Sequence, residues 1–326
     1  MNILVIGLGS MGKRRIRLIL ELFPEAVIYG VDARQDRREE ARSLYGVCCE
    51  ESICQMEKTC HVDAAFVCTA PLSHRQIIAE CLHNKWNVFT ELNLVSDGYK
   101  ENMRAAEENG CKLFLSSTFL YREEINYIRS CIDENTKWNY VYHVGQYLPD
   151  WHHWENFKDF FVGDKRTNGC REIMAIELPW MIKTFGKVTD YHVVSDKISG
   201  LPIDYKDNYL IQLFHESGNK GILVVDVVSP AAVRRLEVYG EHKYLRWDGT
   251  PDGLYEYDAN AQELKKAVLC EKEEHREGYR AFITENAYKN EIKEFFDIVF
   301  QGKKPLYGFE EDMETLKLID SLEGER

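Results

Sequence analysis

Residues 5–12 read Val5-Ile6-Gly7-Leu8-Gly9-Ser10-Met11-Gly12, and they carry the clearest indication of the fold in this sequence. Its Gly-x-Gly-x-x-Gly pattern directly follows a short apolar run and opens a helical pattern. In that context the first glycine permits a tight turn, the second lets the backbone approach a pyrophosphate, and the third lets helix and strand pack closely. Backbone N–H groups from Gly9 through Ser10 and Met11 to Gly12 would bind the anion at the helix N-terminus. The stretch therefore predicts a dinucleotide-binding turn.

An acidic residue stands where a dinucleotide-binding domain uses one. Asp32 ends the second apolar run and lies 20 residues after Gly12. A carboxylate at this spacing can accept hydrogen bonds from the adenosine ribose hydroxyls, which favours NAD. Arg34 and Arg37 follow closely and could instead bind a 2′-phosphate, so NADP stays an alternative.

Short apolar runs alternate with helical patterns from residue 2 to about residue 115, as a parallel sheet covered by helices requires. This alternation predicts an α/β fold, with a doubly wound Rossmann sheet in residues 1–120. The strands are expected at 3–6, 27–31, 64–68, 87–90 and 112–115, and the helices at 11–22, 37–45, 74–84 and 98–109.

After residue 121 the pattern changes, because apolar runs follow one another with only turns between them. This arrangement favours antiparallel pairing, so residues 121–326 are expected to form an α+β domain with a mostly antiparallel sheet for substrate binding and oligomerisation. Strands are expected at 140–146, 208–214, 221–228, 235–239 and 243–247, and helices at 170–185, 286–300 and 310–321.

Composition excludes several classes of protein. The formal net charge of the 326 residues is −13, which disfavours binding to nucleic acid or to an anionic membrane surface. No apolar stretch is long enough to span a membrane, and the ten cysteines show no spacing typical of a zinc site. We expect free thiols, no metal and a cytoplasmic location. The densest basic run, residues 13–17, could face a cofactor phosphate or solvent.

Polar segments follow three of the expected strands of the first domain. They are Thr69-Ala70-Pro71 with His74, Thr90-Glu91-Leu92-Asn93, and Ser116-Ser117-Thr118. The carboxyl ends of parallel strands form the crevice in which such sheets bind ligands, so these segments are expected to line the nicotinamide half of the site.

The chain resembles the Gfo/Idh/MocA oxidoreductases, named for glucose-fructose oxidoreductase and inositol dehydrogenase. The resemblance rests on residues 5–12, on residues 67–71 with His74, and on the helix that ends in Phe185-Gly186. Its most specific part is Gly145-Gln146-Tyr147-Leu148-Pro149-Asp150-Trp151-His152-His153-Trp154-Glu155, which is similar to a segment of a bacterial branch acting on sugars or nonulosonic acid precursors. The resemblance implies hydride transfer between nicotinamide and a sugar, polyol or sugar acid.

The sequence departs from that family at the positions of its proton-transferring residues. The family's Glu-Lys-Pro reads Glu91-Leu92-Asn93 here, and the His and Asp of the second-domain helix correspond to Ile176 and Pro179. If turnover is retained, other groups must move the proton. The candidate catalytic residues are Glu91, Glu172 and His153, and the candidate substrate-binding residues are Tyr121, Trp151, His152, Trp154 and Glu177.

Two hypotheses of different classes follow. In the first, the protein is a dehydrogenase with a relocated acid/base, for which Glu172 is attractive because it lies one helical turn before Ile176 on the same face. In the second, it binds dinucleotide and a sugar-like ligand without turnover, as a sensor or as a partner subunit of an active homologue. We also expect a homo-oligomer, with a dimer as the smallest unit, formed through the sheet of the second domain.

Overall fold

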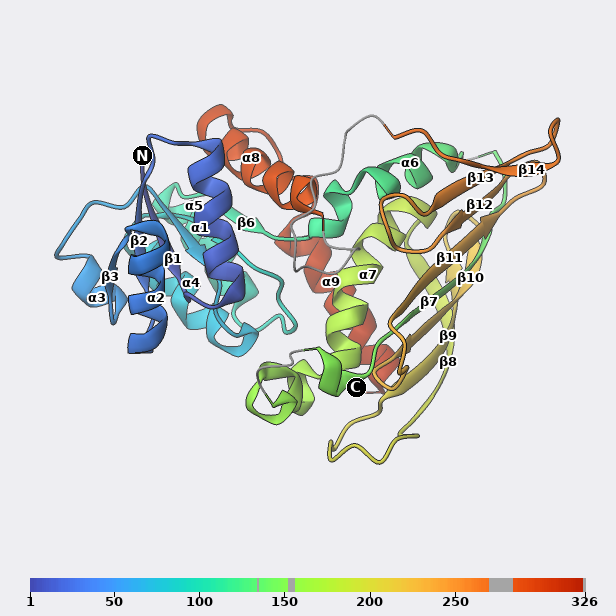
Figure 1. The fold of residues 1–326 in the computed structure, drawn as a ribbon, viewed down its shortest axis with the longest axis horizontal. Helices are drawn as coiled ribbons and strands as arrows, with labels where there is room; N and C mark the ends of the chain where they lie inside the picture. The colour runs from blue at the N-terminus through green and yellow to red at the C-terminus, as the bar shows by residue number, and fades with distance from the viewer. Residues whose placement is uncertain (134, 152–155, 270–283, 325–326) are drawn as a thin grey trace. The chain divides into compact units, whose positions relative to one another are not determined.

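The computed structural model describes residues 1–133, 135–151, 156–269 and 284–324. The chain divides into two compact units, described separately below (Figure 1). The first consists of Met1–Ser117 and Tyr288–Glu314, and the second of Thr118–Ala287 and Thr315–Arg326. No helix among the described residues combines the length and apolar character needed to cross a membrane.

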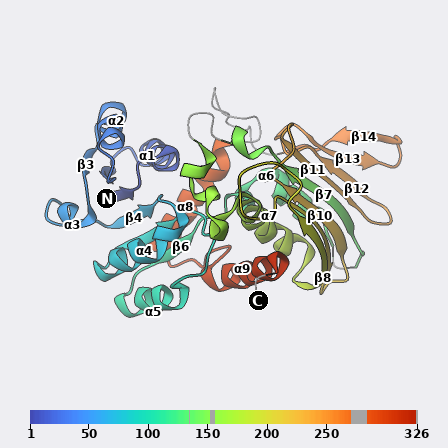
Figure 2. The ribbon, with the colours of Figure 1, turned by 90° about the horizontal axis from the view of Figure 1, so that it is seen from below.

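The first unit is built on a six-stranded sheet in the order β3-β2-β1-β4-β5-β6, with every neighbouring pair parallel. Helices cover both of its faces, α1 and α2 on one and α4 and α5 on the other (Figure 2). This is the doubly wound arrangement that the sequence predicts. The strands are β1 (Asn2–Ile6), β2 (Val27–Val31), β3 (Cys48–Glu50), β4 (Ala64–Val67), β5 (Asn87–Thr90) and β6 (Leu113–Leu115). The helices are α1 (Ser10–Leu22), α2 (Gln35–Tyr45), α3 (Ile53–Met56), α4 (His74–His83) and α5 (Tyr99–Asn109).

Alternate strand residues pack on opposite faces of this sheet. On one face, Leu4 and Ala65 pack in a core that includes Ile78 and Leu82 of α4. On the other, a stack of Phe66, Phe89 and Phe114 from three neighbouring strands meets α8 (Glu285–Gln301).

The aromatic face explains why part of the C-terminal chain belongs to the first unit. Phe295 of α8 meets Phe66 and Phe89 edge to face, and Phe296 packs beside it. The predicted division at residue 120 places residues 288–314 with the second domain, whereas the structure groups them with the first. The amphipathic pattern of a helix shows that it has an apolar face but not which sheet that face covers.

The second unit contains an eight-stranded sheet in the order β14-β13-β12-β11-β7-β10-β9-β8. All neighbouring strands are antiparallel except β7 and β10, which are parallel, so the expectation of a mostly antiparallel sheet is confirmed. Its strands are β7 (Asn139–Gly145), β8 (Val188–Asp196), β9 (Asn208–His215), β10 (Lys220–Asp226), β11 (Val233–Tyr239), β12 (Tyr244–Trp247), β13 (Leu254–Asp258) and β14 (Glu263–Lys266). The helices are α6 (Glu123–Cys131), α7 (Gly169–Phe185) and α9 (Phe309–Glu323), of which α9 begins in the first unit.

Six elements of the structure are not predicted by the sequence pattern: β3, β8, β13, β14, α3 and α6. Strand β8 lies at the sheet edge, and its burial alternates between partly and fully exposed positions, so it offers no continuous apolar signal. Strand β3 and helix α3 have three and four residues and are too short for periodicity to show.

Candidate functional site

The glycine turn between β1 and α1 has the geometry that the motif demands. Gly7 has a φ of +91°, and a Cβ there would lie 2.7 Å from the carbonyl oxygen of Cys68. A Cβ at Gly12 would lie 1.9 Å from the carbonyl oxygen of Gly7, so helix and strand pack too closely for any side chain. Gly9 caps α1, whose first turn starts with Ser10 and Met11 and carries no acidic residue. The helix therefore presents free N–H groups to an anion.

Asp32 lies at the end of β2, beside this turn. Its carboxylate accepts a hydrogen bond from the N–H of Leu8 at 2.8 Å and another from the N–H of Arg34 at 2.9 Å. The guanidinium of Arg37 approaches the same carboxylate at 3.7 Å. The sequence leaves the choice between NAD and NADP to an acid that would bind the ribose and an arginine that would bind a 2′-phosphate. In the structure these two groups, Asp32 and Arg37, lie side by side. The side chain of Arg34 instead pairs with Asp36 at the surface.

The segment after β4 is bound internally. His74 is 2% exposed, and its Nε2 lies 2.9 Å from the carbonyl oxygen of Thr69. The hydroxyl of Ser73 donates to the Thr69 hydroxyl and to the carbonyl of Ala70. Pro71 opens a single turn of 3-10 helix that leads into α4. These contacts fix the strand end, while the two nitrogens of His74 are engaged within the protein.

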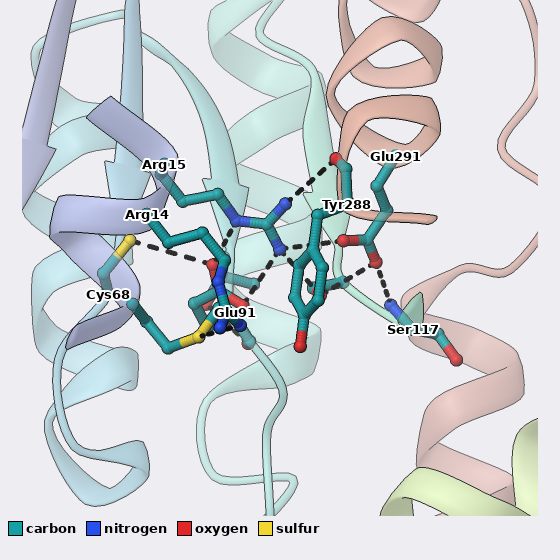
Figure 3. Close-up of polar contacts among 10 residues, drawn as sticks. Arg14, Arg15, Cys68, Glu91, Ser117, Tyr288 and Glu291 are labelled. Carbon is teal, nitrogen blue, oxygen red and sulfur yellow. Dashed lines mark hydrogen bonds and ion pairs between the residues drawn. The ribbon is translucent and has the colours of Figure 1, made fainter. Parts of the chain in front are cut away.

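Glu91, at the end of β5, belongs to a buried ionic cluster (Figure 3). Arg15 of α1 is fully buried and donates from Nε and Nη2 to the two oxygens of Glu91, at 2.5 and 3.1 Å. The same guanidinium pairs with Glu291 of α8 at 2.8 Å and lies over the ring of Phe89. The other oxygen of Glu291 accepts from the hydroxyl of Ser116 and the N–H of Ser117. The cluster joins α1, β5, β6 and α8 at the strand ends.

This cluster bears on two of the hypotheses from the sequence. Both oxygens of Glu91 already accept hydrogen bonds from Arg15, so Glu91 is better suited to a structural role at the strand end than to a catalytic one. The basic run at residues 13–17 does not face solvent as a unit, because Arg14 and Arg15 are 7% and 0% exposed. Arg14 lies over the ring of Tyr288. Arg15 lies between Glu91 and Glu291, which are far from it in the sequence. No local spacing indicates such a contact, so it could not be predicted from the sequence.

Comparison with known protein families gives a match to the first part of the chain. The model described as an oxidoreductase family with an NAD-binding Rossmann fold, GFO_IDH_MocA, matches residues 1–117. This part of the chain is an NAD(P)-binding Rossmann domain. The match covers the glycine turn, Asp32 and the three strand-end segments as far as Ser117. No curated protein matches the sequence.

Solved structures share the fold of the whole chain. An oxidoreductase from Agrobacterium radiobacter in complex with NAD+, L-tartaric acid and magnesium has a TM-score of 0.81 at 12% identity, and the alignment covers 100% of this chain and 96% of that one. UDP-N-acetylglucosamine 3-dehydrogenase from Acidithiobacillus ferrooxidans has a TM-score of 0.76 at 14% identity, with coverages of 100% and 97%. The aldose-aldose oxidoreductase of Caulobacter crescentus has a TM-score of 0.78 at 15% identity, with coverages of 100% and 97%. At these identities the likeness shows the fold alone.

In the second unit, Glu172 differs from the other candidate carboxylates. It stands in the first turn of α7, and its Oε2 is buried without a hydrogen-bond partner among the described residues. Burial raises the pKa of Glu172 to about 8. Glu172 and Ile176 are the partly exposed residues between Gly169 and Met181, which places them on one face of the helix, as the sequence predicts. A carboxyl group whose pKa lies near neutrality can both take up and release a proton.

Glu177, also on α7, has a different environment. It is fully buried, and it accepts hydrogen bonds from Tyr142, Trp180 and Arg234, each at 2.7 Å. These internal contacts connect α7 to β7 and β11 and occupy both oxygens of Glu177. Substrate binding by Glu177 stays a prediction.

The remaining predicted substrate residues divide into two groups. Tyr121 is buried, and the indole N–H of Trp151 donates to the carbonyl of Gln146. His152, His153 and Trp154 lie outside the described residues. In the described part of the chain no three His, Cys, Asp or Glu side chains gather as metal ligands, and the cysteines are free thiols.

Substitutions at Gly9 and Gly12 are expected to separate dinucleotide binding from folding. Gly12→Ala forces a clash with Gly7 and should destabilise the Rossmann domain, whereas a Cβ at Gly9 meets its nearest atom, on Arg37, only at 3.6 Å. Gly9→Ala should therefore keep the wild-type Tm, yet weaken NAD+ binding by about ten-fold or more, because the pyrophosphate approaches the backbone there. Thermal unfolding and calorimetric titration check both, and undiminished affinity of Gly9→Ala would contradict the assigned role.

Proposed function

We propose that the protein is an NAD(P)-dependent dehydrogenase that oxidises a CH–OH group of a sugar, polyol or sugar acid, or reduces the corresponding carbonyl. The observation that carries this proposal is the Rossmann domain at residues 1–117, with its intact glycine turn and strand-end acid. Structures of the same fold that are named as sugar oxidoreductases support the substrate class. The resemblance in residues 145–155 points the same way.

The residues present fit a dinucleotide. The N–H groups from Gly9 to Gly12 would hold the pyrophosphate, in space that a side chain at Gly9 would occupy. Asp32 would accept from the adenosine ribose, and Thr69-Ala70-Pro71 would lie beside the nicotinamide ribose. Since the Asp32 carboxylate would repel a 2′-phosphate, NAD is the preferred cofactor, with Arg37 as the group that would tolerate NADP. When bound, the nicotinamide supplies the acceptor or donor for hydride.

Oxidation of a hydroxyl also requires a base to accept its proton, and we assign this role to Glu172. Its unpartnered oxygen has no internal hydrogen bond to lose, and burial raises its pKa to about 8, so the ionised form is a stronger base than an ordinary carboxylate. Glu91, by contrast, is held by Arg15 as a fixed acceptor. In this account Glu91 shapes the strand end and Glu172 moves the proton.

A dinucleotide-binding protein without turnover is the second candidate function. This second function is favoured by three residues, none of which can exchange a proton. The family resemblance places Leu92, Ile176 and Pro179 at the positions of the proton-transferring residues. The two candidates are separated by incubating the protein with NAD+ or NADP+ and a panel of polyols, sugars and sugar acids while following the absorbance of reduced nicotinamide. Tight NAD+ binding with no turnover on any substrate would favour the sensor or partner subunit.

We further propose that the outer face of the eight-stranded sheet pairs with a second copy of the chain. Val141, Val194, Leu210 and Ile222 are exposed on this face, and they lie on the four neighbouring strands β7, β8, β9 and β10. An exposed apolar area spread over adjacent strands is typical of a subunit interface.

The double substitution Leu210→Glu with Ile222→Glu tests this pairing. Both side chains lie on the exposed face of neighbouring strands, so the fold should be retained while charges block association. Light scattering is expected to give a mass of at least twice 38.1 kDa for the wild type and 38.1 kDa for the variant. A wild-type mass of one chain would contradict the proposal.

A further inference from the structure

A chain of buried polar side chains runs through the first unit from the end of β4 to α9. His74 Nε2 lies 2.9 Å from the carbonyl oxygen of Thr69, and His74 Nδ1 lies 2.6 Å from Oδ1 of Asn93. The amide of Asn93 faces the hydroxyl of Tyr99, which donates to Asp312 at 2.5 Å. All four side chains are at most 3% exposed.

Asn93 is the member of the chain whose contacts are incomplete. Its Nδ2 is buried and faces the hydroxyl of Tyr99, but it makes no hydrogen bond of good geometry within the described residues. The amide borders a cavity of about 10 Å3 that His74 and Tyr99 also line. An amide carries a donor and an acceptor on the same carbon, and rotation exchanges the two.

The orientation with Oδ1 toward His74 requires a charged imidazole. Nε2 faces a carbonyl and Nδ1 faces the amide oxygen, so both nitrogens would have to carry hydrogen. Burial lowers the pKa of His74, which disfavours that charge. The hydroxyl of Thr90, 3.3 Å from Nδ1, already has the carbonyl of Glu91 as an acceptor.

The opposite orientation satisfies every group with no charge. Nδ2 of Asn93 donates to Nδ1 of a neutral His74, whose Nε2–H donates to Thr69. Oδ1 then accepts from the hydroxyl of Tyr99, and Tyr99 accepts from a protonated Asp312. Burial raises the pKa of Asp312 to about 6, so this arrangement is populated at mildly acidic pH.

We propose that His74 and Asn93 are positioning residues for the strand-end segment Glu91-Leu92-Asn93 of the cofactor site, and that the protonation of Asp312 sets the direction of the hydrogen-bond chain that holds them. The proposal rests on the dinucleotide-binding role given above. When Asp312 ionises, the hydroxyl of Tyr99 must donate to it, so Asn93 loses a donor and the chain loses one hydrogen bond. The segment after β5 is then held less firmly, and cofactor affinity falls.

The groups that face Asp312 and His74 leave the direction of this effect unchanged. Tyr99 from α5 and Tyr307 from the segment before α9 both donate to Asp312 and partly stabilise its ionised form. Glu91 is the charged group that acts on His74, and it favours the protonated imidazole more weakly than burial opposes it. Arg75 and Asp97, of opposite charge, both border the cavity.

The test is calorimetric titration with NAD+ between pH 5 and pH 8. Affinity of the wild type should fall about five-fold as pH rises through about 6, the effect of one buried hydrogen bond. Asp312→Asn imitates the protonated acid, because its amide can donate to Tyr99 and accept from Tyr307, so its affinity should not change with pH. Tyr307→Phe removes a donor to Asp312 and should move the transition to higher pH.

A second readout needs no cofactor. In the free protein, the 15N resonance of His74 Nδ1 should move as Asp312 titrates in the wild type and stay constant in Asp312→Asn. The proposal would be contradicted by a wild type that binds NAD+ with the same affinity at every pH. It would also be contradicted by an Asp312→Asn variant that keeps the pH transition. A wild type that binds no NAD+ would instead contradict the proposed function, and the resonance of His74 would still decide whether the chain exists.

Discussion

Replacement of Glu172 by glutamine is expected to lower kcat by about 10²- to 10⁴-fold, the range typical of a lost general acid/base. Glutamine keeps the size and polarity of the side chain but cannot exchange a proton, so NAD+ affinity should be unchanged. The measurement is the initial rate of nicotinamide reduction, with calorimetric binding of NAD+ in parallel. Leu92→Ala is the control, since Leu92 transfers no proton and its truncation should leave turnover in place.

The pH dependence of the same pair sharpens this expectation. Burial raises the pKa of Glu172 to about 8, so wild-type kcat/KM for hydroxyl oxidation should rise as pH increases through 8, and this rise should be missing in any residual activity of Glu172→Gln. Burial disfavours the ionised form of Glu172 in the folded protein, so the protonated form is the one that the fold tolerates best. The stability that this form provides is fully present below the ordinary pKa of a glutamate and is lost as pH rises through 8. Glu172→Gln should therefore unfold at a higher temperature than the wild type at pH 9, but not at pH 4. A rise that persists unchanged in the variant would contradict the assignment.

Replacement of Arg15 by methionine is expected to lower the free energy of unfolding by about 3–5 kcal/mol. The guanidinium is fully buried between Glu91 and Glu291, and its removal leaves the buried carboxylate of Glu291 and the partly buried carboxylate of Glu91 without their shared cation. The loss should be larger at pH 8 than at pH 5, because burial already raises the pKa of Glu291 and protonation of the acid relieves the uncompensated charge. Denaturant unfolding of the wild type and the variant at both pH values checks this.

Arg104→Met is the matched control for that substitution. Arg104 pairs with Glu108 on the surface of α5, with both side chains more than half exposed, and such pairs contribute at most about 0.5 kcal/mol. If Arg15→Met were no more destabilising than Arg104→Met, the buried cluster would contribute no more to stability than an exposed ion pair does.

The glycine turn and Asp32 allowed the fold class to be predicted because their spacing is a local property of the chain. The same is true of the strong apolar runs that became β1, β2, β4 and β5, within one or two residues of their predicted ends. The parallel pairing of β7 with β10 could not be predicted, because these strands are far apart in the chain and their alternation does not specify a partner. The same holds for the helix α8, because its apolar residues Phe295 and Phe296 do not specify which sheet they cover.

The candidate site was predictable only in part. Helical spacing points to Glu172, and the structure adds its buried, unpartnered oxygen. Arg15 and Glu291 were not recognised as a pair, because a contact between residues 276 positions apart leaves no spacing to detect. The same holds for Asp312, whose partner Tyr99 lies 213 positions away. The positions of strand ends can be predicted from the sequence, whereas the contacts between side chains from distant parts of the chain cannot.

The most direct test of the proposed function is the absorbance of reduced nicotinamide when the wild-type protein is mixed with NAD+ and a panel of polyols, sugars and sugar acids. We predict turnover with at least one member of the panel, faster with NAD+ than with NADP+, and its loss in Glu172→Gln. Tight NAD+ binding without turnover on any substrate would contradict the dehydrogenase account and leave a dinucleotide-binding sensor or partner subunit.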